Sequence, residues 1–335
     1  MSRQQTFHEV PVIDVGALVV PDPDPQALDE TVRRIGDACR DVGFLYVRNH
    51  GLPDGLSERM MAQTRAFFDL PIEEKMKLRL GQTSQFRGYI PMLAEVTATK
   101  RDYHECLDLQ PLSGRDAETI AAAKLARRGR HPLDDPDQWP AALPEFRPVM
   151  MEAWSALTRL GEQLAAGMAL SLGLDAGFFQ KYAGDELCDL RLSHYPPFQP
   201  DRSLDDVEFG MGAHVDYGFL AIVQQDGVDG LEVRNPDGEW VNAPHIPGTL
   251  LVNIGLMMQR WTNDRYTATW HRVRFPGGRH RYSMPFFFEP AFDAVIAPVP
   301  ECCGADDPPR YEPVQFGTWV VEQFSTAYDN KEDQA

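Results

Sequence analysis

The chain has 335 residues, of which 43% are hydrophobic and 10% aromatic, so it can bury a large core and is not disordered for most of its length. Its formal net charge of −18 at pH 7 argues against binding to nucleic acid and against docking on anionic membranes. These values are those of a soluble enzyme without nucleic-acid or membrane partners.

The sequence shows no membrane-spanning or signal-peptide pattern, and its cysteines are few. No segment approaches the roughly 18 consecutive apolar residues that span a bilayer, and the residues after Met1 lack the hydrophobic core of a signal peptide. The five cysteines are scattered, and the adjacent Cys302 and Cys303 have neither zinc-site spacing nor a disulfide framework around them. We therefore expect a reduced, cytoplasmic protein.

The N-terminal region begins with a predicted helix. Asp24 followed by Pro25 suits a helix start, with the aspartate as the capping residue. Apolar residues then recur at helical spacing, at Leu28, Val32, Ile35 and Cys39. Gly43 ends this helix, residues 44–47 predict a strand, and residues 56–68 predict a second helix.

The middle of the chain is irregular until a long helix begins. Residues 82–114 mix glycine, proline and charge without a clean period, so we expect loops and short strands over the mouth of a site. Prolines make residues 131–144 a predicted loop. From Glu145 an apolar stripe at helical spacing continues to a stop near Gly173. We interpret it as one long helix that packs against a barrel of strands.

Short strands separated by turns follow. A hairpin is predicted over 231–242 with its turn at Asn235–Gly238, and further strands over 249–253 and 282–288. Residues 315–328 return to a helix. This pattern predicts an α+β fold, with a double-stranded β-helix (jelly-roll) core and flanking helices that include the long one.

Two histidines and one aspartate form the most informative pattern. His214 and Asp216 are one residue apart, and His271 follows later. With nine histidines and 50 acidic residues, about one His-x-acid triplet is expected by chance, so the pair alone proves nothing. In a strand, however, positions i and i+2 face the same side, and the apolar run 219–223 favours a strand. Two imidazoles and a carboxylate form the facial triad of non-heme Fe(II) oxygenases.

Arg281 and Ser283 add a second element to this pattern. The planar guanidinium suits a carboxylate, and a hydroxyl two residues further along a strand shares its face. Together with the triad, the pair indicates a metal site beside a carboxylate site.

Segments spread over most of the chain resemble one enzyme family. They are Pro11–Asp14, Ala38–Gly51, Leu190–Pro197, Ala213–Gly218 and His280–Ser283. The chain resembles the isopenicillin N synthase-like branch of the Fe(II)/2-oxoglutarate-dependent oxygenases. The resemblance implies one oxygenase unit over 1–335. Within it, 8–115 is an N-terminal family-like region and 184–292 is the jelly-roll core that binds Fe(II) and 2-oxoglutarate.

The resemblance also implies roles for individual residues. It implies Fe(II) at His214, Asp216 and His271. It implies a site for the distal carboxylate of 2-oxoglutarate at Arg281, Ser283, Tyr195 and Ser193. Two positions depart from the family pattern: Ser193 stands where Asn is frequent, and Leu256 stands where an acidic residue is usual.

The implied activity is oxidation of a small-molecule metabolite by hydroxylation, desaturation or cyclisation. Dioxygen and 2-oxoglutarate are the co-substrates, and succinate and CO2 are released. Two alternatives stay open at this point. One is an oxidase of the same fold in which Arg281 binds the substrate itself, and the other is a non-catalytic, metal-binding jelly-roll protein.

Substrate contacts are expected in loops and in side chains beyond the iron. The predicted contact residues are Arg87, Tyr89, Glu105, Phe286 and Phe288. Two opposite charges and three aromatic rings predict a polar, zwitterionic molecule with an apolar body. The protein is expected to be a monomer or a weak homo-oligomer.

Overall fold

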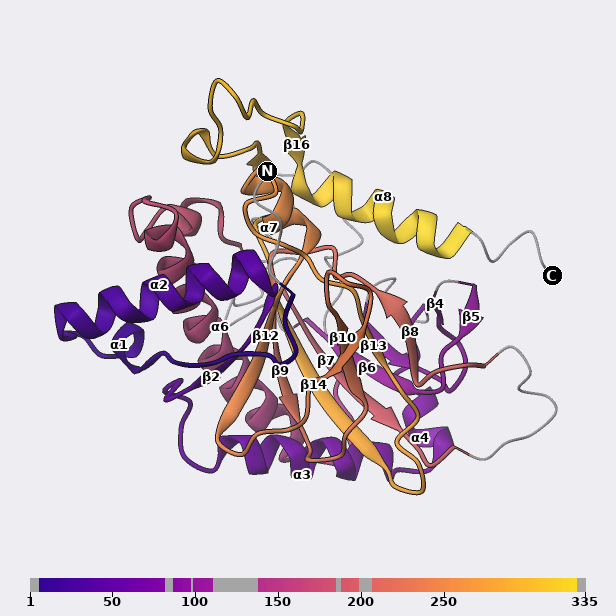
Figure 1. Cartoon of the computed structure of the whole chain (residues 1–335). Helices are drawn as coiled ribbons and strands as arrows, with labels where there is room; N and C mark the ends of the chain where they lie inside the picture. Colours follow the sequence, from indigo (N-terminus) through magenta and orange to yellow (C-terminus); the bar gives the residue numbers. More distant parts are fainter. Residues whose placement is uncertain are drawn as a thin grey trace, which may run out of the picture.

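Two β-sheets form the centre of the molecule (Figure 1). The computed structural model describes residues 6–81, 87–97, 99–110, 138–184, 188–198 and 207–329. The larger sheet has eight strands in the order β1-β2-β12-β9-β14-β7-β6-β3. In that order the strands are Val12–Asp14, Phe44–Arg48, Thr249–Ile254, Leu220–Gln225, Arg281–Phe288, Asp189–Tyr195, Glu105–Leu109 and Gly88–Ile90. N-terminal strands therefore occupy both edges, and C-terminal strands occupy the middle.

The smaller sheet has four antiparallel strands in the order β11-β10-β13-β8. In that order they are Trp240–Asn242, Leu231–Arg234, His271–Val273 and Met211–His214. Its Leu231 and Val233 belong to one buried cluster with Tyr46, Tyr195 and Leu251 of the larger sheet. The two sheets thus face each other, and the predicted jelly roll and its β10–β11 hairpin are confirmed.

Helices cover the other face of the larger sheet (Figure 1). The long predicted helix is α6 (Phe146–Ser171), and α2 (Pro25–Asp41) and α3 (Leu56–Phe68) pack against it. On α6, Trp154 meets Phe286 of β14 edge to face, with ring centroids 5.1 Å apart. Gly161 lets the ring of Phe288 approach closely, since a Cβ there would lie 2.7 Å from the ring. The main apolar core lies between these helices and the sheet.

The remaining elements are short, apart from one C-terminal helix. They are α1 (Gly16–Val19), α4 (Ile72–Met76), β4 (Val96–Thr97), β5 (Lys100–Arg101), η2 (Phe179–Tyr182), α7 (Leu256–Trp261), β15 (Val295–Ile296), η4 (Pro300–Cys302), β16 (Val314–Gln315) and α8 (Phe316–Asp329). The helix expected over 315–328 is α8, and those expected over 25–41 and 56–68 are α2 and α3. Asp24 caps α2 as predicted, by accepting a hydrogen bond of 2.9 Å from the backbone N–H of Ala27.

Residues 82–114, expected to form loops and short strands, contain two short strands of the larger sheet, β3 and β6. Every residue of β3 and β6 is buried, because the sheet is covered on both of its faces. Residues 82–86, 98 and 111–137 lie outside the described residues, and so does the first half of the loop predicted over 131–144.

Gly43→Ala is expected to destabilise the fold. Gly43 has φ of +72°, and its N–H closes α2 on the carbonyl of Ala38 at 2.8 Å. A Cβ at this position would lie 2.2 Å from the backbone oxygen of Thr267. Left-handed backbone costs other residues roughly 1–3 kcal/mol, and the clash adds to this cost. We expect urea unfolding to show a loss of about 2 kcal/mol or more.

Gly55→Ala is the matched control, because Gly55 has φ of +70° but no atom within 4 Å of the place that a Cβ would take. It should show the conformational cost alone. Equal losses in the two variants would contradict the role of the Thr267 contact.

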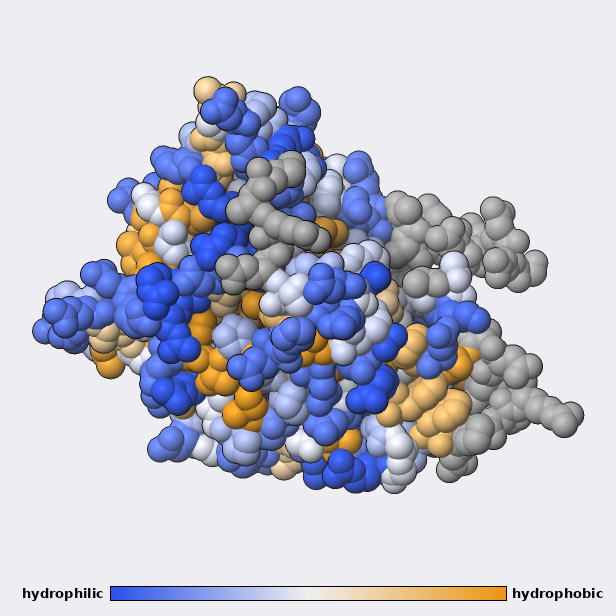
Figure 2. Space-filling model, in the orientation of Figure 1, coloured by the Kyte–Doolittle hydropathy of each residue, from blue (hydrophilic) through white to orange (hydrophobic). Residues whose placement is uncertain are grey.

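The visible surface of the molecule is mostly polar. Hydrophilic residues cover most of this face, with hydrophobic ones scattered between them (Figure 2). Among the described helices, none is both long and apolar enough to cross a membrane.

Candidate active site

One face of the larger sheet points toward the smaller sheet. Because side chains alternate along a strand, residues of one parity share this inner face. It carries Arg281, Ser283, Pro285 and Phe287 of β14, Arg191, Ser193 and Tyr195 of β7, and Cys106 and Asp108 of β6. Contacts across the strands agree with this assignment: the guanidinium of Arg281 lies 4.9 Å from the ring centre of Tyr195. On β14, β7 and β6 the inner face therefore gathers several polar side chains, whereas on β2 and β12 it carries apolar ones such as Tyr46 and Leu251.

The two histidines and the aspartate of the sequence motif meet between the sheets. His214 ends β8, and His271 begins β13 directly opposite it. Each Nε2 lies 3.6 Å from the same Oδ1 of Asp216, and the three ligand atoms lie within 4.8 Å of one another. The strand expected to hold both His214 and Asp216 stops at His214, so the aspartate comes from the connection to β9. The side chains converge all the same, as the spacing predicted.

Backbone carbonyls fix the tautomer of both imidazoles. His214 Nδ1 lies 2.9 Å from the oxygen of Gly212, and His271 Nδ1 lies 3.2 Å from that of Thr269. A carbonyl can only accept, so each Nδ1 carries the proton and each Nε2 presents its lone pair to the centre. Burial and the neighbouring His214 also lower the pKa of His271 to about 4, which keeps this ring neutral. Both rings are thus preset for metal ligation.

The carboxylate of Asp216 is held by β12 and the turn that follows it. Asn253 donates from Nδ2 to Oδ2 at 2.6 Å, and the backbone N–H of Leu256 donates to the carbonyl of Asp216 at 2.8 Å. Burial raises the pKa of Asp216, but the interactions of its carboxylate with His271 and His214 and the hydrogen bond from Asn253 outweigh burial and hold the pKa well below its usual range. The carboxylate is therefore ionised. Sequence reasoning assigned Asn253 no role, and its only signal was its place beside Leu256 in the family-like segment.

Arg281 is a buried cation without an ionic partner among the described residues. It is 1% exposed, its Nε has no hydrogen-bond partner, and its contact with Ser283 Oγ is long, at 3.4 Å. An isolated buried charge is costly, so proteins pair such charges. The free edge of the guanidinium beside a hydroxyl and the Tyr195 ring fits an external carboxylate.

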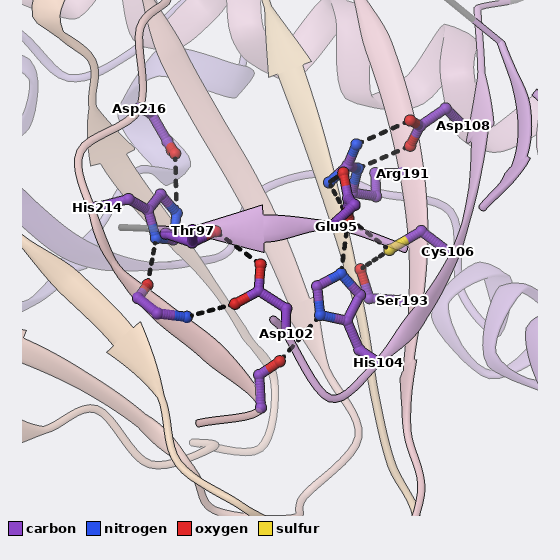
Figure 3. Close-up of polar contacts among 12 residues, drawn as sticks. Glu95, Thr97, Asp102, His104, Cys106, Asp108, Arg191, Ser193, His214 and Asp216 are labelled. Atoms are coloured by element: carbon purple, nitrogen blue, oxygen red, sulfur yellow. Dashed lines mark hydrogen bonds and ion pairs between the residues drawn. The ribbon is translucent and has the colours of Figure 1, made fainter. Parts of the chain in front are cut away.

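A second group of polar residues lies on the same inner face (Figure 3). Arg191 pairs with Asp108 through two bonds of 2.7 and 2.8 Å, and its Nη1 lies 3.3 Å from both oxygens of Glu95. Glu95 also accepts from His104 Nε2 at 2.8 Å. We call Glu95, His104, Asp108 and Arg191 the charged cluster. Sequence reasoning did not predict this cluster.

Comparison with known proteins identifies the family. A family model described as "non-haem dioxygenase in morphine synthesis N-terminal" matches residues 10–142, and "2OG-Fe(II) oxygenase superfamily" matches residues 186–290. The chain is 35% identical over 330 residues to "Homoarginine-6-hydroxylase 2-ODD-233" of Oryza sativa subsp. japonica, covering 96% of this chain and 98% of that protein. The chain belongs to the 2-oxoglutarate-Fe(II) oxygenases.

Further relatives agree with this membership. The oxygenase is 33% identical over 315 residues to "2-oxoglutarate-Fe(II) type oxidoreductase hxnY" of Emericella nidulans, covering 92% of this chain and 88% of that protein. Its fold matches the crystal structure of a full-length Neurospora crassa protein in complex with alpha-KG and thymine, with a TM-score of 0.80 and 25% identity. That match covers 95% of this chain and 97% of the Neurospora chain.

The oxygenase uses Fe(II) and 2-oxoglutarate to oxidise a small molecule. Membership sets aside the metal-binding protein without activity, and the relative named for 2-oxoglutarate and the complex with alpha-KG favour an enzyme that consumes 2-oxoglutarate over the same-fold oxidase.

Four of the five predicted substrate contacts lie away from the inner face. Phe286 and Phe288 face α6, and Glu105 pairs with outward-facing His194 and accepts hydrogen bonds from Tyr89 and Lys75. The prediction that they contact substrate is wrong. Side chains alternate along a strand, and these four lie on the opposite face of the sheet from Arg281 and Ser283. Half-buried Phe287 and Pro285 take the inner positions instead.

Arg87, the fifth, is 2% exposed and donates from Nε to Gln110 at 2.8 Å, just before β3. Nothing in its described contacts brings it to the triad.

Proposed function

We propose that His214, Asp216 and His271 hold the iron of this oxygenase, and that Arg281 and Ser283 bind the distal carboxylate of 2-oxoglutarate, assisted by Tyr195 and Ser193. The observation that carries the proposal is the buried guanidinium without an ionic partner among the described residues, on the same inner face as a triad whose imidazoles both present Nε2. A cation and three ligands so arranged suit a co-substrate that carries two carboxylates.

The bound iron, with 2-oxoglutarate and dioxygen, supplies the chemistry that converts a C–H bond into C–OH, with succinate and CO2 as co-products. The protein's own residues supply geometry and charge. Gly212 and Thr269 hold the imidazoles in one tautomer, and Asn253 orients the carboxylate of Asp216. Arg281 fixes the far end of the co-substrate and thereby its orientation. Pro285 and Phe287 continue the same face of β14 beyond Ser283 as half-buried apolar side chains.

For the substrate, we propose a small amino acid with a basic side chain. Arg191, the cation of the charged cluster, is already neutralised by the two-bond pair with Asp108. Glu95 has only the long contact with Arg191 on its Oε1 among the described residues, so that oxygen can accept from an ammonium or guanidinium group. The relative named as a homoarginine-6-hydroxylase, whose named substrate carries a guanidinium, supports this class. The basic part of the zwitterion expected earlier is retained, with Glu95 in place of Glu105 as the carboxylate that it would meet.

A substrate panel tests this class. We expect homoarginine, arginine or lysine to raise succinate formation well above the substrate-free rate, and thymine to leave it unchanged. Glu95→Gln keeps the shape but removes the charge, and the loss of a charged hydrogen bond of about 1.5–3 kcal/mol should weaken coupling to the basic substrate about tenfold or more. Glu232→Gln, which loses a carboxylate bound to Arg272 in the smaller sheet, is the control. Equal succinate formation with all compounds would contradict the proposed class.

We also propose the expected setting of the enzyme: a cytoplasmic monomer or weak homo-oligomer without nucleic-acid partners. The five cysteines form no disulfide, which a reducing compartment favours. We keep the division into a region 8–115 and a core 184–292 within one unit 1–335. The single unit 1–335 is supported by the larger sheet, in which β2 and β6 of the first region pair with β12 and β7 of the second.

A further inference from the structure

The strand that ends in His214 has a free edge. β8 is the outermost strand of the smaller sheet, paired with β13 on one side only among the described strands. Peptide groups on such an edge need partners other than a neighbouring strand. The iron ligand His214 therefore stands at the end of the strand whose position is least determined by sheet pairing.

A segment from the N-terminal half completes this edge. The backbone N–H of Gly212 donates to Asp102 Oδ1 at 2.8 Å. His104 Nδ1 donates to the carbonyl of Gly210 at 2.9 Å, and the backbone N–H of Tyr103 donates to the carbonyl of Phe209 at 3.2 Å. Asp102 is 2% exposed, so its contact with Gly212 is shielded from water. The edge is thus held by a few specific bonds from residues that lie far away in the sequence.

Gly212 connects Asp102 to the metal ligand. Its N–H is held by Asp102, and its carbonyl accepts from His214 Nδ1 at 2.9 Å. The second oxygen of Asp102 accepts from Thr97 Oγ1 at 2.6 Å. A Cβ on Gly212 would lie 3.0 Å from the Cβ of Thr97, so the close approach favours glycine. Figure 3 shows Asp102 between the His214–Asp216 pair and the charged cluster.

We propose that Asp102 is a positioning residue for His214, acting through the peptide groups of Gly212. The inference rests on the proposed function, in which His214 binds iron. The carbonyl that fixes the tautomer and the direction of the imidazole belongs to the same residue whose N–H Asp102 holds. Moving that residue turns or releases the ring, and partners that orient a metal-binding histidine typically contribute about 10–100-fold to metal affinity.

Asp102→Ala tests the proposal with a readout other than turnover. Anaerobic calorimetry on the metal-free protein should give a dissociation constant for Fe(II), or for Mn(II) as a stable probe, about 10–100-fold weaker than in the wild type. Asp102→Asn should restore the affinity, because the amide oxygen still accepts from Gly212 and its NH2 can donate to Thr97.

Asp14→Ala is the matched control. Asp14 likewise accepts from a glycine N–H, that of Gly16 at 3.0 Å, and from one side-chain amide, that of Asn49 at 2.7 Å, but it lies on the edge strand β1. It should lose a comparable amount of thermal stability and bind metal normally. Equal metal affinity in Asp102→Ala and the wild type overturns the inference, and so does an equal loss in Asp14→Ala.

Two further variants separate the possible failures. If Asp102→Ala does not fold, Thr97→Val decides the question: it removes one anchor of Asp102 with little change in shape and should weaken metal binding several-fold. Unchanged affinity in that variant overturns the inference. His214→Ala tests the proposed function itself. Metal binding that survives His214→Ala refutes the ligand assignment, whereas binding lost in His214→Ala but retained in Asp102→Ala refutes only the role of Asp102.

Discussion

Replacing His271 with alanine is expected to abolish succinate formation. In the proposed site the ring supplies one of two nitrogen ligands, its Nε2 lies 3.6 Å from Asp216, and burial keeps it neutral and ready to bind metal. A site with one imidazole and one carboxylate keeps too few ligands to retain Fe(II) in a fixed orientation. Turnover with the best substrate and metal binding by calorimetry should both fall below detection.

The fold should survive this change, because the His271 side chain makes one hydrogen bond, to a backbone carbonyl, and an edge contact with Phe44, at 5.3 Å between ring centres. The melting temperature of the metal-free variant should stay near that of the wild type. His245→Ala, which removes an imidazole outside the triad, is the control and should keep full activity. Activity in His271→Ala at the wild-type level would refute the ligand assignment.

Removing the charge of Arg281 should have opposite effects on binding and on stability. A charged hydrogen bond to the co-substrate contributes about 1.5–3 kcal/mol. Arg281→Lys, which loses the planar fork, should therefore weaken 2-oxoglutarate binding about tenfold or more. Arg281→Leu should weaken it further. Calorimetric titration with 2-oxoglutarate measures both losses.

The second measurement is the thermal stability of each variant without 2-oxoglutarate. In the wild type the guanidinium is 1% exposed and lacks an ionic partner among the described residues. Arg281→Leu removes this buried charge, so the variant should melt at the same temperature as the wild type or higher. Added 2-oxoglutarate should stabilise the wild type but not Arg281→Leu. Arg59→Leu, which loses an exposed pair with Glu152, should keep the 2-oxoglutarate response. A 2-oxoglutarate response retained in Arg281→Leu would show that the carboxylate binds elsewhere.

The sequence predicted those parts of the site that follow from local periodicity. His214 and Asp216 converge because positions two apart in extended chain share a side, and Arg281 and Ser283 share one for the same reason. The same alternation places Phe286 and Phe288 on the opposite face from Arg281, contrary to the prediction. Counting from Arg281 places Phe287 on the inner face, and the large rings beside it belong to the helix-facing core.

The rest of the site depends on contacts between distant segments. Asp102 and Gly212, or Asn253 and Asp216, meet only because strands from different parts of the chain become neighbours. No pattern within a short stretch of the sequence predicts contacts of this kind. Short strands were expected over 82–114, but the position of β6 was not predicted for a related reason: the buried charges of Glu105 and Asp108 give it the composition of a loop, and partners on β7 and α4 neutralise those charges only after folding.

The placement of N-terminal strands at the two edges of the larger sheet has a consequence for biosynthesis. β2 leaves the ribosome long before β12, the strand with which it pairs, and β6 long before β7. Until those partners arrive, apolar strands such as Phe44–Val47 have no sheet to join. Contacts between residues so far apart in the sequence slow folding, and they prolong the time for which aggregation-prone segments are exposed. We therefore expect yields of the enzyme in cells to depend on chaperones and on temperature, and fragments that end before β12 to aggregate.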